Sequence, residues 1–442
     1  MKGVEKQSII LCCLVFTLSC ATKPSEYKDI DHAVSSNDFN GGIGALVKAQ
    51  GKGIPIYRIN NAVSLFLDKG LLEHYAEKYA DSSQSLQEAE RLIDEAYTKS
   101  ITAEVMSYIA NDNTKEYPGE DFEDIYINVF NALNYYYNGS LEGAMVEIRK
   151  LTMSSGKLDM LGRKYEKAEE KAMRQLKEDQ LLSLTKPINF SNSALARYLS
   201  VLFYLADSNA DGVRIESAKL IEAFAANPNI YSYPIPRQVT DAQNVPQGTA
   251  RLNVIAFTGL SPIKEEQIIR QPLIFFQNLP LQFAQFKLPV LVKRPSSISR
   301  IEVIAGDEVF NLELLEDMGA VMEETFKAHY NNIFLKTYIR TIIKYTAADI
   351  AATEIGRQRG TTFALLSAAG AKVSIDATEG ADIRMSRFLP DKAYIGGINL
   401  EPGTYNIKVN FYQGDTVFSS KEYNDFVLKE KRLNLIEAIN LK

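Results

Sequence analysis

The spacing of apolar residues changes once along this chain of 442 residues, and that change determines the expected fold class. From about Ile54 to Asn227, apolar side chains recur every three or four residues, as one face of a helix requires. After the proline-bearing stretch 230–249 the pattern indicates strands, and 405–411 alternates apolar and polar residues strictly. We therefore expect an α+β protein with an α-helical N-terminal part and a β-rich C-terminal part.

Three helical segments match the tetratricopeptide scheme, in which two antiparallel helices approach each other through small residues. The best match is 128–151, with Ala132 and Ala144 as the small contacts. The segment 71–96 repeats the scheme with Ala76 and Ala89, and 196–224 matches it more weakly. These matches predict a tetratricopeptide-like solenoid over 54–235. An irregular helical bundle is the alternative, because extra helices must lie between the repeats.

The C-terminal part, 245–442, is expected to contain strands and one long helix. Gly306-Asp307 lies between two alternating segments and predicts a hairpin. The amphipathic stretch at about 316–356 predicts the long helix. The strands of about 380–442 predict a terminal β-sandwich-like module.

The first twenty residues have the pattern of an export signal. Lys2 and Lys6 precede an apolar run from Ser8 to Leu18, which is too short to span a bilayer. The run ends at Ser19-Cys20, which resembles a bacterial lipobox. All three cysteines lie in this segment (Cys12, Cys13 and Cys20). We expect a signal peptide over 1–20, lipid attachment at Cys20 and a tether over 21–53. Ala21 favours the outer membrane, facing the periplasm; an ordinary secretory signal is the alternative.

The sequence gives little support for catalysis. The three histidines are far apart and fit no metal-binding motif, so no metal or other cofactor is expected. Ser261 and Lys264 match the Ser-x-x-Lys pattern of one hydrolase class, but the pattern recurs elsewhere in the chain. A net charge of −6 does not favour nucleic-acid binding. We expect a non-enzymatic protein, with an envelope hydrolase as the least favoured alternative.

Two groups of residues are candidates for binding. One group lies on the first helix of the best repeat, where a solenoid turns side chains toward its concave groove, and would bind partner proteins or peptide segments: Tyr126, Asn128, Asn131, Asn134, Tyr136 and Tyr137. The other is a basic stripe on the long helix that would contact an anionic partner: Lys336, Arg340 and Lys344. Ordinary helix packing is the alternative for the first group, and a solvated or internally paired face for the second.

Three segments together, 117–151, 257–266 and 380–409, resemble a family of uncharacterised bacterial envelope proteins, often lipoproteins, with a tetratricopeptide-like N-terminal part. The resemblance implies the same architecture and no established enzymatic activity. The resemblance leaves the partner open. The sequence as a whole favours a lipid-anchored scaffold of the cell envelope that binds proteins through its helical groove. The alternative is a lipoprotein that binds cell wall or glycan through the terminal β module. The oligomeric state stays open.

Overall fold

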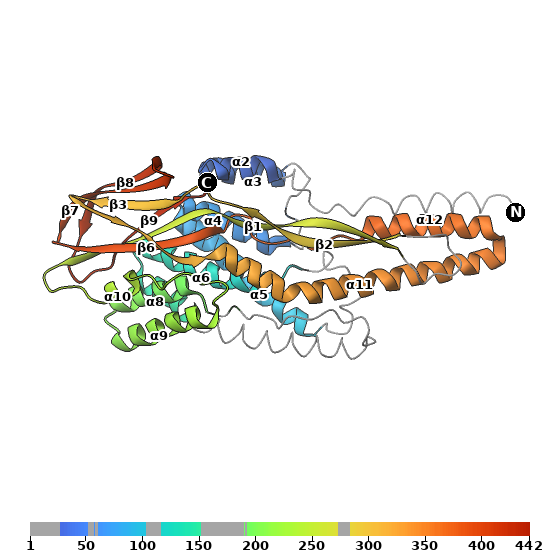
Figure 1. Ribbon diagram of the computed structural model, residues 1–442, viewed down its shortest axis with the longest axis horizontal. Coiled ribbons are helices and arrows are strands. Elements are labelled where there is room, and N and C mark those ends of the chain that lie inside the picture. The colour runs from blue at the N-terminus through green and yellow to red at the C-terminus, as the bar shows by residue number, and fades with distance from the viewer. Residues whose placement is uncertain are drawn as a thin grey trace.

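The computed structural model describes residues 27–51, 57, 61–102, 116–151, 190, 192–272 and 283–442. Helices occupy the N-terminal part and strands the C-terminal part, so the predicted α+β class is confirmed (Figure 1). The described N-terminal helices include one over 141–151 and those labelled α2 (Lys28–Ser35), α3 (Phe39–Gly51), α4 (Ala62–Tyr75), α5 (Tyr79–Thr102), α6 (Asp121–Tyr137), α8 (Ala194–Ala206), α9 (Ala210–Ala226) and the short α10 (Gln238–Asp241). The predicted signal peptide, including Cys20, lies outside the described residues.

Four helix pairs share one turn geometry. The first helix of each pair is followed by a residue with positive φ: Asn37, Glu77, Gly139 and Ser208, at 58, 61, 78 and 56°. The amide of that residue and the amide after it donate to carbonyls three and five residues earlier, over 2.8–3.2 Å. This is the Schellman arrangement, which satisfies the last carbonyls of a helix. The pairs are α2–α3, α4–α5, α6 with 141–151, and α8–α9.

In three of these turns, the residue after the positive-φ position caps the second helix. Its side chain accepts a hydrogen bond from the amide of a glycine three residues later. The cap–glycine pairs are Asp38–Gly41, Ser140–Gly143 and Asn209–Gly212, at 2.8, 3.1 and 2.9 Å. A side chain at Gly143 or Gly212 would collide with a tyrosine ring of the preceding helix. The glycine therefore allows the two helices to pack closely.

Two sequence expectations about the helical part are wrong. The predicted tether contains the pair α2–α3, whose Ile30, Val34 and Leu46 are buried in the main core. Its glycine-rich composition hid the same cap-and-glycine pattern. In the segment 71–96, Ala76 is the C-cap of α4 and not the helix contact. The close approach is at Gly70, where a Cβ would lie 2.6 Å from a methyl carbon of Leu86.

The strands that the structure describes form two sheets. One has the order β2-β1-β6-β5, with β9 parallel to the first half of β1, and the other has the order β4-β3-β7-β8. Their bounds are β1 Ala250–Pro272, β2 Phe283–Arg294, β3 Arg300–Ala305, β4 Glu308–Asn311, β5 Glu313–Asp317, β6 Pro390–Leu400, β7 Gly403–Gln413, β8 Thr416–Leu428 and β9 Asn434–Asn440. The predicted hairpin at Gly306-Asp307 is present as β3–β4.

The strands after residue 380 do not form a module by themselves. β6 and β9 pair with β1, while β7 pairs with β3, which comes from the earlier part of the chain. The two sheets pack face to face through apolar residues from both stretches, such as Val254, Val303 and Val409. The sandwich therefore needs 250–317 as well as 390–440, because the C-terminal strands alone lack their partners.

The predicted long helix is confirmed as α11 (Met318–Arg359), and α12 (Thr361–Thr378) follows it. Together they extend from the sandwich along the long axis of the molecule, beside β1 and β2 (Figure 1). The main core joins the predicted helical and β-rich regions, since Leu71 of α4, Phe130 of α6 and Phe257 of β1 belong to one cluster. The two regions are thus packed as a single body.

Candidate functional site

The predicted binding face of α6 contacts the chain's own strands. The Tyr126 hydroxyl donates to Glu316 Oε1 of β5 at 2.6 Å. The Tyr136 hydroxyl donates to the Leu433 carbonyl at 2.9 Å and accepts from the Leu435 amide at 3.1 Å. Strands β5 and β9 therefore occupy the face that a partner would use. The prediction that this face is an open groove is wrong, because the C-terminal strands fill it.

Asn134 belongs to a buried chain of hydrogen bonds. Its Nδ2 donates to Ser82 Oγ at 2.8 Å, so its Oδ1 faces His74 Nδ1, at 2.6 Å. His74 Nε2 lies 2.8 Å from Glu437 Oε1 of β9. Both ring nitrogens thus face oxygen acceptors, as an imidazolium requires. Burial acts to lower the pKa of His74, but the charge and hydrogen bond of Glu437 outweigh it and the pKa is raised.

The other three candidates on α6 are packing residues. Asn128 Nδ2 donates to the Asp124 carbonyl at 2.9 Å, one turn earlier. Asn131 is fully buried, and neither polar atom of its amide has a hydrogen-bond partner among the described residues. The ring of Tyr137 stacks on Tyr79, with centroids 4.9 Å apart. These contacts lie within the helical part.

Glu316 is the centre of a second buried cluster. Besides the bond from Tyr126, its carboxylate accepts from the Tyr231 hydroxyl at 3.0 Å. It also accepts from the Ser193 hydroxyl at 2.7 Å and from the Leu195 amide at 2.9 Å, at the start of α8. A negative charge at a helix N-terminus is favourable. Burial nevertheless raises the pKa of Glu316, against the effect of these hydrogen bonds. The cluster joins β5 to α6 and α8.

A third cluster fixes the loop that precedes β6. Asp68 of α4 accepts from the Ser386 hydroxyl and the Arg387 amide, at 2.9 and 2.8 Å. Glu123 of α6 accepts from the Ser386 amide and from the Tyr117 hydroxyl, at 2.5 and 2.8 Å. Burial raises the pKa of Asp68 to about 6. Burial, with the nearby charge of Glu120, raises the pKa of Glu123 to about 7.

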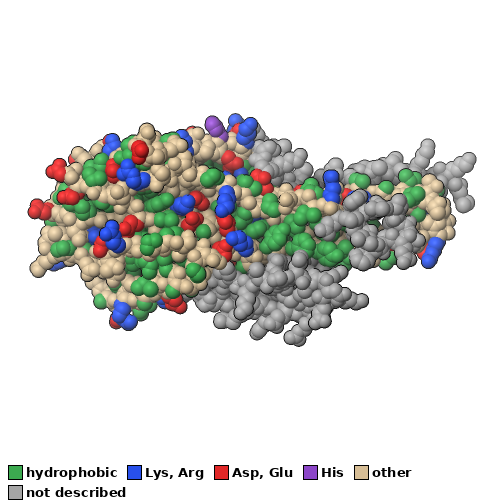
Figure 2. Space-filling model, viewed as in Figure 1, with side chains coloured by type: hydrophobic (Ala, Val, Ile, Leu, Met, Phe, Trp, Pro, Cys, Tyr) green, Lys and Arg blue, Asp and Glu red, His purple; other side chains and the backbone are tan. Residues whose placement is uncertain are grey.

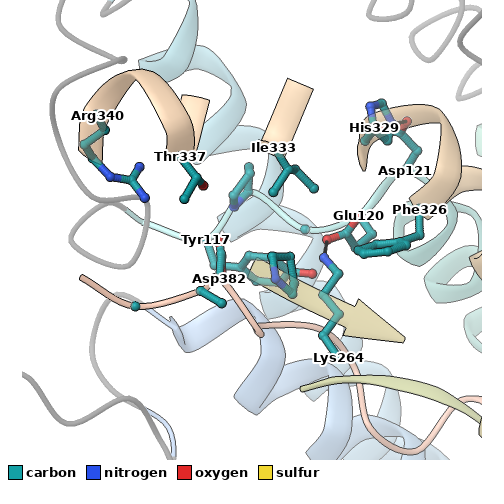
Figure 3. Close-up of a pocket in the computed structure, with 15 residues that line it drawn as sticks. Tyr117, Glu120, Asp121, Lys264, Phe326, His329, Ile333, Thr337, Arg340 and Asp382 are labelled. Atoms are coloured by element: carbon teal, nitrogen blue, oxygen red, sulfur yellow. Dashed lines mark hydrogen bonds and ion pairs between the residues drawn. The ribbon is translucent and has the colours of Figure 1, made fainter. Parts of the chain in front are cut away.

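Next to this third cluster is a cavity of about 170 Å³ (Figure 3). Its walls come from the segment before α6, from β1, from the middle of α11 and from the loop after α12. The polar or charged side chains among its lining residues are Tyr117, Glu120, Asp121, Lys264, His329, Thr337, Arg340 and Asp382. Elements from both parts of the sequence therefore meet here.

Four charged groups of the cavity form two pairs, Lys264 with Glu120 and His329 with Asp121. Figure 3 shows Lys264 meeting Glu120 and His329 beside Asp121, with His329 Nε2 and Asp121 Oδ2 3.3 Å apart. Burial acts to lower the pKa values of Lys264 and His329, but the charge of Glu120 and the hydrogen bond to Asp121 outweigh it and raise both. The cavity wall is thus built from ion pairs.

The basic stripe on α11 is also paired internally. Arg340 Nε donates to Glu379 Oε2 at 2.9 Å, with both side chains only 3% exposed, and Lys344 pairs with the other oxygen of that carboxylate. The expectation that Arg340 and Lys344 contact an external anion is therefore wrong for these two residues. The side chain of Lys336 lies outside the described residues.

The geometry offers a small polar cavity in which the described side chains form the pairs Lys264–Glu120 and His329–Asp121. Ser261 and Lys264 lie on β1, beside an irregularity in its pairing with β2, and the amine of Lys264 is held by Glu120. Among the described residues, no group of His, Cys, Asp or Glu side chains is arranged to hold a metal ion. In the same part of the chain, no helix has the length and apolar character to cross a membrane.

Sequence reasoning missed the buried acids that join the two regions. Asp68 had a detectable signal, since it interrupts the apolar run 65–72 of a helix. Glu123 is also the third residue of α6 and forms a capping box with Glu120. This local role is enough to account for a glutamate at that position, so the sequence does not reveal its hydrogen bonds to distant residues. Comparisons with protein-family models, curated proteins and solved structures found no match to this chain.

Proposed function

We propose that this chain is a lipid-anchored, non-enzymatic protein of the bacterial cell envelope, held at the outer membrane by Cys20 and facing the periplasm. One sequence observation carries the proposal: an apolar run ends at Cys20, and none of the following 422 residues is a cysteine. An exported protein has access to disulfides. A single cysteine placed where a signal would be cleaved fits lipid attachment.

Within this proposal the helix pairs form a tetratricopeptide-like framework. Their repeated turn and cap geometry supports that assignment. The concave face of α6 holds β5 and β9, so the framework supports the β-sandwich and presents other surfaces to envelope proteins.

Metabolic labelling with a clickable fatty acid tests the anchor. Wild-type protein and the Cys13→Ser variant should take up the label and fractionate with the outer membrane, whereas Cys20→Ser should do neither. Label retained in Cys20→Ser would contradict the proposal.

In-cell crosslinking of wild-type and Cys20→Ser proteins then tests the scaffold role. Partner proteins should be captured by the anchored form alone, and a wild-type protein that captures none would contradict that role.

A glycan-binding role is the second candidate, and the outer face of the second sheet favours it. There the Tyr412 hydroxyl donates to Glu302 at 2.8 Å, and Ser420 Oγ donates to Asn410 at 2.7 Å. Arg300 lies over one face of the Tyr412 ring, 3.7 Å from its centroid. Fixed polar groups suit the hydroxyls of a sugar, and an aromatic ring beside them suits its apolar face.

Full-length protein should then sediment with purified peptidoglycan. Tyr412→Ala should reduce retention, and Tyr405→Ala, on the same strand but directed toward the other face, should not. Equal retention of both variants would count against this surface. The isolated 380–442 segment is unsuitable, since its strands pair with β1 and β3.

A further inference from the structure

The far end of α11 and all of α12 form a helical arm that extends beyond the sheets (Figure 1). The helices reverse at Gly360, whose φ is 92°. The base of the arm is well fixed: Tyr338 stacks on Phe286 of β2 with centroids 5.5 Å apart, and the Tyr345 hydroxyl donates to Asp376 at 2.7 Å. The arm is therefore a defined part of the fold.

The arm has small residues inside and large apolar residues outside. Ala352 and Ala368 are buried, and a Cβ at Gly356 would lie 3.0 Å from that of Ala364. In contrast, Phe363, Leu366 and Val373 are 53, 66 and 58% exposed. Their spacing of three and seven residues places them on one face of α12. Removing such side chains from water is favourable, and the isolated arm does not gain that free energy.

Charge at the turn of the arm is basic. Residues 355–371 include Arg357 and Arg359 but no acid, in a chain whose net charge is −6. Further along α12, Lys372 pairs with Asp376 at 2.9 Å, so the positive charge is concentrated at the turn. Arg357 has a loose pair with Glu354 at 3.7 Å, and both side chains are more than half exposed. Such a pair is weak and easily exchanged. Figure 2 shows a basic side chain at the far end of the arm, away from the body.

We propose that the outer face of this arm docks on the surface of an anionic bilayer. Phe363, Leu366 and Val373 would enter the boundary between head groups and acyl chains, while Arg357 and Arg359 bind lipid phosphates. The arm lies at one end of the long axis, away from the sandwich (Figure 1). The repeated positive charge disfavours a second copy of the same stretch as the occupant.

This inference goes beyond the lipid anchor and is tested without it. The chain has no tryptophan, so Leu366→Trp in a Cys20→Ser background introduces a single fluorophore. Vesicles of phosphatidylcholine containing about one third phosphatidylglycerol should shift its emission to shorter wavelength, and added salt should reverse the shift. Ile221→Trp, at an exposed position of α9, is the control. Both proteins have the same N-terminal apolar run, so any binding of that run to vesicles would occur equally in both.

No shift at position 366, or an equal shift at both positions, would overturn the proposal. Sedimentation with the same vesicles provides a second measurement. In the Cys20→Ser background, Phe363→Ser should weaken binding about tenfold and Arg359→Ala about fivefold. Arg214→Ala on α9 should leave binding unchanged. If analytical ultracentrifugation instead shows a dimer that Phe363→Ser dissociates, the occupant is a second copy and the membrane proposal fails.

Discussion

The junction between helices and sheets differs from the helical arm in where it places polar and apolar side chains. At the junction, acids and amides are buried and their hydrogen bonds cross between regions, as with Asp68, Glu123 and Glu316. In the arm, alanines are buried while Phe363 and Leu366 face outward. Polar residues that suggested binding hold the fold together, and apolar residues of the long helical stretch lie on the surface.

The difference follows from what each region packs against. A buried carboxylate is tolerated only where donors surround it, and the junction supplies amides and hydroxyls from several elements. The arm has one neighbouring helix, and small residues allow the pair to approach closely. Its larger residues therefore contact solvent unless another surface covers them.

The largest expected effect is at Glu316. Glu316→Ala leaves two tyrosine hydroxyls, Ser193 and the Leu195 amide without their common acceptor. We expect a loss of about 3–5 kcal/mol in the free energy of unfolding, measured by urea denaturation. Glu313→Ala on the same strand should cost about 0.5 kcal/mol or less, because its partner Arg237 is highly exposed. Equal losses would remove the distinction between buried and surface acids.

The pH dependence of stability provides a second test of the junction. Since Glu123 has its pKa raised to about 7, the folded state holds a proton that the unfolded state releases near pH 4.5. The free energy of unfolding therefore falls as the pH rises from about 4.5 to about 7. The raised pKa values of Asp68 and His74 also make the folded state less stable as the pH rises. Glu123→Gln should remove about 2–3 kcal/mol of this fall between about pH 5 and about pH 8. An unchanged slope would contradict the assignment.

Two asparagines on α6 allow a matched comparison. Asn134→Leu breaks bonds to His74 and Ser82, while Asn131→Leu removes an amide for which the described residues provide no hydrogen-bond partner. The steric change is the same at both positions. We expect Asn134→Leu to be the less stable by about 2 kcal/mol in thermal or urea unfolding. A reversed order would show that Asn131 has the more important polar role.

The smallest effect is expected in the arm. Leu366→Ser should change the free energy of unfolding by about 0.5 kcal/mol or less, because the side chain is already exposed. Leu71→Ser, in the main core, is the contrasting variant and should be strongly destabilising. A large loss for Leu366→Ser, measured by thermal unfolding in solution without lipid, would show that the outer face is already covered.

Much of the candidate site was beyond sequence reasoning. The periodicity located α6 and α11, but it did not reveal which strand would cover Tyr136 or that Glu379 would pair with Arg340. Those contacts join residues 297 and 39 positions apart. The sequence could have predicted the helix pair α2–α3, because the cap-and-glycine pattern at 37–41 recurs at 139–143 and 208–212. The glycines of this segment belong to a helix pair: Gly41 donates its amide to the cap Asp38, and a Cβ at Gly42 would lie 3.3 Å from Val34 of α2.

The sequence by itself determined the α+β class, the helix pairs around Gly139 and Ser208, the long helix and the strand alternation of β7. These features depend on local hydrogen bonds and on the period of apolar residues, which neighbouring positions specify. Only the tertiary structure decided that β5 and β9 cover the predicted binding face of α6 and that the last strands are shared between two sheets. The physical reason is that a side chain's burial depends on which distant element covers it, and that is settled by packing of the whole chain.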